Sequence, residues 1–264
     1  MRAKEQRFLV DVGMSDLPFP MKVISRDCAG GQSTIANISV NARIMHEFEA
    51  RWIDEFIKIV HEHRDRIGTE TLGANIKDYG KRLKASMVRI DFDYPFFIEK
   101  RTPVAKEKCL VRYLCRYSAK SPSIGGKPSI TFRISVPCIT TYPSSRASVP
   151  QGLFGQLSVF QVEVVPKKEV YPEDIVDIVD RHAIVPVYSF LTEEDQNFVI
   201  AEIHSKQKTS VVALDEIKTD LANNNCIDWY SVTCSNYGML HTYSTVISTE
   251  KSSWVPFSGY EGEV

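Results

Sequence analysis

Residues 32–45, QSTIANISVNARIM, contain the pattern from which the type of fold follows. Apolar residues alternate with polar ones from Ile35 to Ile44, with one slip in the alternation. A period of two residues is typical of a strand with one buried face, and a slip in that period favours a β-bulge. We therefore predict a long strand with a bulge. The glycine pair at 30–31 predicts a hairpin turn from an earlier strand at 19–26.

The period changes directly after this strand. In residues 48–63, FEARWIDEFIKIVHEH, apolar side chains recur every three or four positions, which predicts a helix with a wide apolar stripe. Gly68 breaks the pattern, and residues 70–85, ETLGANIKDYGKRLKA, predict a second and weaker helix. The chain is therefore expected to begin with two strands and two helices.

The rest of the chain echoes this order in a longer form. Alternating stretches predict strands at 87–98, 109–119, 129–139, 156–165, 227–235 and 240–248. Helical spacing predicts helices at 171–183, 189–204 and 210–225. Thr192 is a candidate N-cap for the helix that follows it. The pattern predicts an α+β fold of antiparallel sheets with helices packed on one face, divided into a first module at 1–145 and a second at 146–264.

Composition places the chain among ordinary globular proteins and argues against several other classes. Its 264 residues are 43% hydrophobic and 25% charged, and the formal net charge is -1. A near-neutral charge argues against a dedicated nucleic-acid binder, so we expect no nucleic-acid partner. No stretch approaches the roughly 18 apolar residues of a membrane span, so we expect no membrane partner. The N-terminus lacks the apolar core of a signal peptide, so we expect a cytoplasmic protein.

Few side chains stand out as candidates for chemistry. His241 is the one histidine placed where strand ends are expected to gather, which makes it a candidate ligand or acid–base group. A partly buried, hydrogen-bonded histidine is the alternative. Lys100 and Arg101 follow a predicted strand end and could neutralise a phosphate, or could be an exposed pair without a ligand. The six cysteines include no CxxC spacing, so buried small side chains are expected.

Four stretches, in order along the chain, resemble one protein family. They are GGQSTIANISV at 30–40, YPFFIEKRTPVA at 94–105, SVPCITTYPSS at 135–145 and SNYGMLHTYS at 235–244. In order and separation they are similar to the GTP cyclohydrolase type IB family, and the resemblance covers nearly the whole chain. It implies that the two modules are tandem tunnelling-fold modules.

The resemblance also implies an activity and an assembly. Members of this family are hydrolases that convert GTP to dihydroneopterin triphosphate, the entry step to folate and related pterins. They use a bound divalent metal such as zinc, manganese or iron, and form homotetramers with active sites at subunit interfaces. For this chain the resemblance therefore implies a homo-oligomer, a tetramer, and a small-molecule ligand with a purine- or pterin-like ring.

The sequence departs from the family pattern where the resemblance implies metal ligands. The family turn Ser-Leu-Cys-Pro-Cys-Ser corresponds to TTYPSS at 140–145, and a two-histidine segment corresponds to FGQLSV at 154–159. Of the two histidines in the family's last ligand segment, this sequence keeps only His241. The family's acidic metal ligand corresponds to Gln196, and the carboxylate that would hold the purine base corresponds to Val211. Hydroxyl and amide groups are poor substitutes for thiolate and imidazole ligands. We therefore expect a divergent paralogue with no metal cofactor.

Three functions stay open on these grounds, so the sequence leaves undecided whether the chain is an enzyme. The first is altered chemistry in the family's pocket, with His241, Tyr142 and Tyr243 as catalytic residues. The second is a non-catalytic ligand-binding protein or partner subunit. The third is a genuine GTP cyclohydrolase. The side chains expected to contact a ligand are Gln32, Ser33, Lys100, Arg101, Ser144, Gln156 and Gln196.

Overall fold

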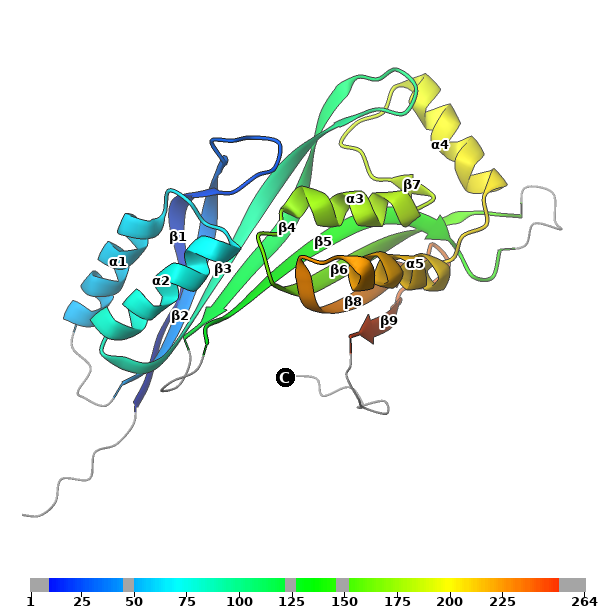
Figure 1. Cartoon of the computed structure of the whole chain (residues 1–264). Coiled ribbons are helices and arrows are strands. Elements are labelled where there is room, and N and C mark those ends of the chain that lie inside the picture. Colours follow the sequence, from blue (N-terminus) through cyan, green and yellow to red (C-terminus); the bar gives the residue numbers. More distant parts are fainter. Residues whose placement is uncertain (1–9, 45–49, 122–126, 146–151, 252–264) are drawn as a thin grey trace, which may run out of the picture.

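The computed structural model describes residues 10–44, 50–121, 127–145 and 152–251 (Figure 1). In chain order its elements are β1 (Val10–Val23), β2 (Gln32–Ile44), α1 (Arg51–His63), α2 (Thr69–Arg82), β3 (Ala85–Arg101), β4 (Lys108–Lys120), β5 (Ser129–Thr141), β6 (Gly155–Pro166), α3 (Pro172–His182), β7 (Val185–Pro186), α4 (Glu193–Ser205), α5 (Ser210–Asn223), β8 (Ile227–Tyr237) and β9 (Ser244–Glu250).

One antiparallel sheet runs through the whole described chain. Its strand order is β1-β2-β3-β4-β5-β6-β8-β9, and the short β7 pairs with β5. β5 pairs directly with β6, from Phe132 opposite Val164 to Thr141 opposite Gly155. The expected antiparallel α+β fold is therefore confirmed, and the sheet continues across the division that we predict between residues 145 and 146.

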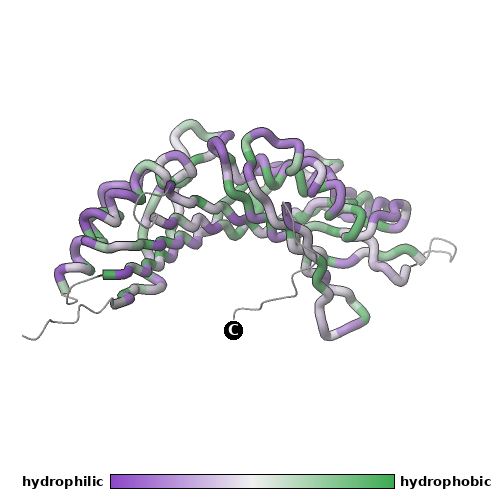
Figure 2. The backbone as a smooth tube through the Cα atoms, turned by 60° about the horizontal axis from the view of Figure 1, so that its bottom comes forward, coloured by the Kyte–Doolittle hydropathy of each residue, from purple (hydrophilic) through white to green (hydrophobic). Residues whose placement is uncertain are grey.

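The helices cover one face of this sheet, as predicted (Figure 1). α2 packs on β3, β4 and β5, while α3 packs on β5 and α5 packs on β8. Figure 2 shows the backbone curved into an arch, with the helices on its convex side. In the described part of the chain, no helix covers the concave face, and none is long and apolar enough to cross a membrane.

Alternation along the strands decides which side chains form the core. In β5 the side chains of Phe132, Ile134, Val136 and Cys138 are fully buried, and the residues between them are partly exposed. Burying one large apolar side chain contributes about 1.5–3 kcal/mol to folding. Buried residues from both halves of the chain form a single core cluster between the sheet and the helices.

The predicted bulge lies in a different strand. The register of β1 with β2 shifts between Met14 and Leu17, where Asp16 takes a positive φ of 58°. In β2 buried and more exposed side chains alternate regularly from Ala36 to Ile44. The apolar Ile35, just before this stretch, faces outward and is 63% exposed. The bulge therefore belongs to β1, and the slip in the sequence pattern marks an exposed isoleucine.

Several strand boundaries also differ from the prediction, most of all the starts of β1 and β9, and one turn agrees with it. β1 begins at Val10, earlier than expected, and β9 begins at Ser244, so residues 240–243 form a loop. The hairpin turn at the glycine pair is confirmed. Gly31 has a positive φ of 71°, and its N–H donates to the carbonyl oxygen of Cys28 at 2.8 Å.

Candidate active site

The ends of β5, β6 and β8 enclose a hollow of about 210 Å³, which we call the aromatic pocket. Its lining residues are Tyr142, Pro143, Ser144, Gln156, Asn236, Gly238, His241, Tyr243 and Thr245. The pocket thus brings together five of the side chains expected from the sequence to act on a ligand. These five are Tyr142, Ser144, Gln156, His241 and Tyr243.

A tight turn after β5 fixes the position of Tyr142. The N–H of Tyr142 donates to the carbonyl oxygen of Phe154 at 3.0 Å, which extends the pairing of β5 with β6 by one step. The N–H and the hydroxyl of Ser145 both donate to the carbonyl oxygen of Tyr142, at 3.0 and 2.6 Å. The tyrosine is only 7% exposed, so its ring forms a wall of the pocket.

Four rings follow one another along this wall. Tyr142 stacks on Phe154 with 4.9 Å between ring centroids, and His241 stacks on Tyr243 with 4.8 Å. Tyr142 and His241 are 6.5 Å apart and tilted by 35°. Centroid separations of 4.5–7 Å are those at which aromatic rings attract one another. The exposed rings of His241 and Tyr243 therefore offer a flat surface on which another planar ring can stack.

Buried amide and hydroxyl groups form the floor of the pocket. Nε2 of Gln156 donates to Oγ1 of Thr140 at 3.3 Å and to Oδ1 of Asn236 at 3.2 Å. The hydroxyl of Ser158 donates to the same Oδ1 at 2.7 Å and lies 2.7 Å from Oγ1 of Thr140. Oε1 of Gln156 accepts no hydrogen bond from any described residue, so it can accept one from a ligand. Of these four residues, the sequence analysis identified only Gln156.

The other five expected ligand contacts lie outside this pocket. Nε2 of Gln32 donates to the carbonyl oxygen of Phe97 at 2.8 Å, and its Oε1 accepts from the N–H of Phe97 at 2.7 Å. Ser33 is exposed on β2. Arg101 donates to the carbonyl oxygen of Lys106, and Gln196 to that of Leu191. Lys100 is the fifth.

Lys100 is partly buried, in an ion pair between the sheet and a helix. Its Nζ, at the end of β3, donates to Oδ2 of Asp180 in α3, and it lies 5.4 Å from the centre of the Tyr113 ring. Burial raises the pKa of Asp180, while the charge and hydrogen bond of Lys100 oppose that rise. In the described chain Lys100 therefore joins β3 to α3, and its contact with a ligand stays a prediction.

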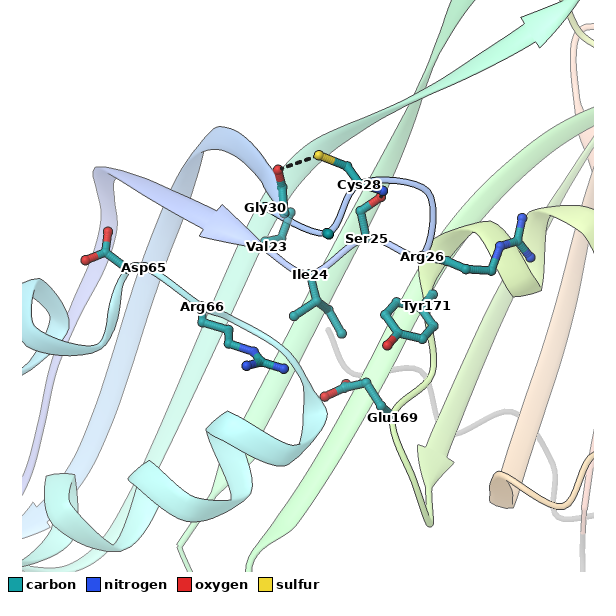
Figure 3. Close-up of a pocket in the computed structure, with 12 residues that line it drawn as sticks. Val23, Ile24, Ser25, Arg26, Cys28, Gly30, Asp65, Arg66, Glu169 and Tyr171 are labelled. Carbon is teal, nitrogen blue, oxygen red and sulfur yellow. Dashed lines mark hydrogen bonds between the residues drawn. The ribbon is translucent and has the colours of Figure 1, made fainter.

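A larger hollow, of about 420 Å³, lies beside the turn between β1 and β2 (Figure 3). The guanidinium group of Arg66 points into it beside Glu169 (Figure 3). Glu169 accepts from the N–H groups of Thr69 at 2.6 Å and Glu70 at 3.3 Å, which start α2. This carboxylate therefore caps a helix N-terminus. None of the site residues expected from the sequence lines this hollow.

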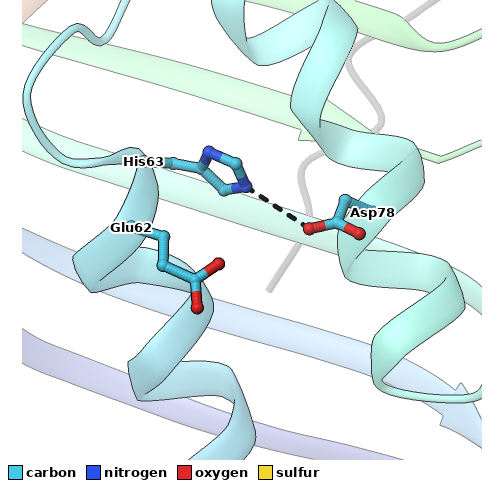
Figure 4. A group of neighbouring side chains, drawn as sticks. All are labelled: Glu62, His63 and Asp78. Atoms are coloured by element: carbon cyan, nitrogen blue, oxygen red, sulfur yellow. Dashed lines mark hydrogen bonds and ion pairs between the residues drawn. The ribbon is translucent and has the colours of Figure 1, made fainter.

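A carboxylate–histidine cluster lies where α1 meets α2 (Figure 4). The ligand atoms of Glu62, His63 and Asp78 lie within 4.8 Å of one another, and Nε2 of His63 is 3.4 Å from Oδ2 of Asp78. The guanidinium group of Arg82 also pairs with Glu62 at 2.5 Å and with Asp78 at 3.5 Å. Imidazole and carboxylate groups are the donors that zinc accepts in catalytic sites. The donor types fit a divalent metal, which would compete with Arg82.

The chain is similar in sequence to proteins of one family over almost its full length. A family profile described as type I GTP cyclohydrolase folE2 matches residues 2–246. GTP cyclohydrolase FolE2 of Geobacter sp. (strain M21) is 29% identical over 241 residues, which are 91% of this chain and 89% of the relative. GTP cyclohydrolase FolE2 of Citrifermentans bemidjiense is 27% identical over 241 residues, with the same shares of both chains.

A solved structure is similar in fold. Uricase from Arthrobacter globiformis superposes with a TM-score of 0.51 at 9% identity, covering 98% of this chain and 99% of that chain. At this identity the similarity concerns the fold alone. The tunnelling fold that the sequence resemblance implied is confirmed.

The expectation of a chain without a metal cofactor is wrong. The profile and the relatives are those of the metal-dependent family that the resemblance implied, and the described residues include a cluster with suitable donors at Glu62, His63 and Asp78. From the sequence, metal ligands are expected only at the turn at 140–145 and in the other segments that align with the family's ligands. Glu62, His63 and Asp78 cannot be recognised there as one cluster, because they come from two helices that only the fold brings together.

Proposed function

Because the chain belongs to the type I GTP cyclohydrolase folE2 family, we propose that it is an enzyme that hydrolyses GTP with the purine ring held in the aromatic pocket. One observation carries this proposal: the segment that matches the family, residues 2–246, includes every residue that lines the pocket. The products would be dihydroneopterin triphosphate, a precursor of folate and related pterins, and formate, which carries C8 of the purine. The same proposal places the protein in the cytoplasm, where GTP is available.

The purine base would be held by stacking and by one directed hydrogen bond. The exposed rings of His241 and Tyr243 provide the stacking surface, and Tyr142 closes the other side. Oε1 of Gln156 would accept a hydrogen bond from an N–H group of the base. Because Thr140 and Asn236 hold the amide of Gln156 on its Nε2 side, the orientation of this acceptor is fixed before the ligand arrives.

Opening of the purine ring by water requires proton transfers that side chains of the pocket can perform. A general base takes a proton from the attacking water, and a general acid delivers one to the departing ring nitrogen. The ring nitrogens of His241 make no hydrogen bond with any described residue, so they are available for both tasks. The rings of Tyr142 and Tyr243 flank this histidine, and their hydroxyl groups would orient the water or the departing ring nitrogen.

A divalent metal, when bound, supplies Lewis-acid activation of water or of a substrate oxygen. The donors of suitable type are those of Glu62, His63 and Asp78. This cluster shares no residue with the aromatic pocket within one chain, so the proton transfers above are assigned to the residues of the pocket alone.

A homo-oligomer, with four subunits as in the family, is part of the same proposal. Large apolar side chains beside the pocket are open to solvent in the single chain, among them Tyr237, Met239 and Leu240, which are 51%, 73% and 64% exposed. Contiguous exposed apolar surface of this kind is typical of an interaction site. Contact with another subunit there would also shield the stacked rings from water. Light scattering of the purified protein measures the subunit number directly.

A second candidate function has support from the pocket itself. Its lining contains one imidazole, that of His241, together with neutral hydroxyl, amide and apolar groups. Such a lining can bind a purine- or pterin-like ring without opening it, or can direct a different reaction on it. In that case the chain would be a divergent paralogue that acts as a binding protein, as a partner subunit or as an enzyme of altered chemistry.

One experiment separates the two candidates. The purified protein is incubated with GTP and with zinc, manganese or iron in turn, while calorimetry records GTP binding and chromatography records pterin formation. Turnover in wild-type protein supports the cyclohydrolase if His241→Ala reduces turnover by more than its weaker GTP binding accounts for. GTP binding with no turnover in the presence of zinc, manganese or iron supports the second candidate. Failure to bind GTP contradicts the cyclohydrolase, and failure to bind either GTP or a pterin contradicts both candidates, because each assigns the ring to this pocket.

A further inference from the structure

Four charged side chains form a row across the concave face of the sheet. Asp93 of β3 lies opposite Arg116 of β4, Arg116 lies opposite Arg133 of β5, and Arg133 lies opposite Glu163 of β6. The sign order across the strands is therefore negative, positive, positive, negative. Like charges directly opposite each other on neighbouring strands repel and destabilise a sheet. We call these four residues the charge row. The placement of two arginines directly opposite each other at its centre needs an explanation.

Each arginine of the charge row pairs outward, away from the other. Nε and Nη2 of Arg116 donate to the two oxygens of Asp93 at 2.6 and 2.9 Å. Nε of Arg133 donates to Oε2 of Glu163 at 2.7 Å, and its Nη2 contacts the same carboxylate. In both guanidinium groups the remaining nitrogen, Nη1, makes no hydrogen bond within the described residues. The outer carboxylates thus hold the two groups in place and leave donors free.

A hollow of about 170 Å³ lies beside the two arginines. It is lined by Asp93, Leu114, Cys115, Arg116, Arg133, Ser135 and Gln161. Ser135 stands between Leu114 and Gln161 in the neighbouring row of the sheet. Neither the hydroxyl of Ser135 nor the amide of Gln161 has a hydrogen-bond partner in the described chain. Four side chains of the lining, those of Arg116, Arg133, Ser135 and Gln161, therefore offer hydrogen-bond donors to the hollow. The carboxylate of Asp93, which also lines it, is paired with Arg116.

We propose that this hollow binds a phosphate group, held by Arg116 and Arg133 and completed by Ser135 and Gln161. Guanidinium groups match phosphate oxygens in geometry and charge, and hydrogen bonds between charged partners are about twice as strong as neutral ones. A phosphate group has enough oxygens to accept from all four side chains, whereas a carboxylate has two. Bound phosphate would also remove the repulsion between the two arginines.

The phosphate site is separate from the aromatic pocket of the same chain. Ser135 and Thr141 are six positions apart on β5, and a strand rises about 3.3 Å per residue, so about 20 Å separates the two sites along the strand. A nucleotide bound in the aromatic pocket of the same chain does not reach it. The proposal therefore does not depend on the function proposed above.

The test is a calorimetric titration with inorganic phosphate at constant ionic strength. Wild-type protein is expected to bind phosphate with saturation, and Arg116→Gln and Arg133→Gln are each expected to weaken binding by about tenfold or more. Arg112→Gln is the matched control, because Arg112 is an exposed arginine on the same strand and face, without a partner among the described residues. This control is expected to bind as the wild type does.

Three results would overturn the proposal. The first is the absence of saturable binding to the wild type at millimolar phosphate. The second is an equal loss in Arg112→Gln, which would mean that any positive charge on this face attracts phosphate. The third is full affinity in Arg116→Lys, which keeps the charge but loses the planar fork. Melting curves without phosphate establish that each variant is folded. Parallel titrations of the wild type and Arg116→Gln with GTP show whether a nucleotide can supply the group, because GTP binding in the aromatic pocket should be equal in the two proteins.

Discussion

Gly238 and Tyr142 lie so close together that a Cβ at position 238 would be 2.6 Å from Cε2 and 3.2 Å from Cδ2 of the tyrosine. On another side the tyrosine ring stacks on Phe154 at 4.9 Å. The ring that forms the wall of the aromatic pocket is therefore held between a glycine and a phenylalanine, and its position depends on the absence of a side chain at 238.

Gly238→Ala is expected to weaken GTP binding or turnover by about tenfold or more, because the added methyl group displaces the Tyr142 ring and a small misplacement in a site is costly. Calorimetry and the turnover assay measure the effect. Gly73→Ala is the matched control: its Cβ would lie 3.9 Å from Ile130, within a helix, so it should leave GTP binding unchanged and stabilise the fold by about 0.5–1 kcal/mol. Equal GTP binding by Gly238→Ala and wild type would contradict the role of the Tyr142 wall.

A buried carboxylate makes the fold sensitive to acid. Oδ1 of Asp195 accepts from the N–H groups of Val104 at 2.7 Å and Ala105 at 3.0 Å, and Oδ2 accepts from the hydroxyl of Thr192 at 2.7 Å. Burial alone would raise the pKa of Asp195, but the hydrogen bonds from Thr192, Val104 and Ala105 outweigh it and hold the pKa well below its usual range. The side chain joins the loop after β3 to the start of α4.

The direction of the pH effect follows from this lowered pKa. A carboxyl group whose pKa is lower in the folded state contributes stability above its unfolded pKa, about 3.9, and loses it as the pH falls towards the folded value. Asp195→Asn is therefore expected to be less stable than wild type at pH 7, with a difference that narrows below about pH 4. Urea unfolding at several pH values measures it. A difference that stayed constant with pH would contradict the assignment.

Local patterns in the sequence were sufficient to predict the positions of the helices. α3, α4 and α5 lie where their apolar spacing predicts, and Thr192 caps α4 by accepting from the N–H of Asp195 at 3.3 Å. These features depend on residues within a few positions of one another. The bulge was predicted in the wrong strand, because the sequence pattern shows that Ile35 is apolar but does not show that its side chain faces solvent.

The candidate site depends on pairing between distant segments, so the sequence indicated only part of it. Gln156 and Asn236 are 80 positions apart, as are Lys100 and Asp180. One signal could have identified Asn236, because a polar residue at an inward position of a strand requires a buried hydrogen-bond partner. No local signal identifies the partner of Lys100, because α3 is placed beside β3 only by the complete sheet.

The ion pair between Lys100 and Asp180 is expected to matter for stability. Lys100→Met leaves a largely buried carboxylate without its partner, and such a loss costs about 3 kcal/mol or more. The double variant Lys100→Met, Asp180→Asn is expected to recover much of the loss, because the unpaired charge is gone. Urea unfolding of the wild type, the two single variants and the double variant gives the coupling energy between the two side chains. Additive changes in the free energy of unfolding would contradict the stabilising role of the pair. If the double variant folds well but binds GTP weakly, Lys100 also contacts the ligand, as the sequence predicts.

The metal site gives the last prediction. His63→Ala is expected to lower the metal content of the purified protein by half or more, because the imidazole is the one nitrogen donor of the cluster. His61→Ala is the matched control, since His61 is an exposed histidine of the same helix that lies outside the cluster of three donors. Arg82→Ala is expected to raise metal affinity, because it removes the cation that pairs with Glu62 and Asp78. Elemental analysis after dialysis against zinc or manganese measures all three, and unchanged metal content in His63→Ala would place the metal elsewhere.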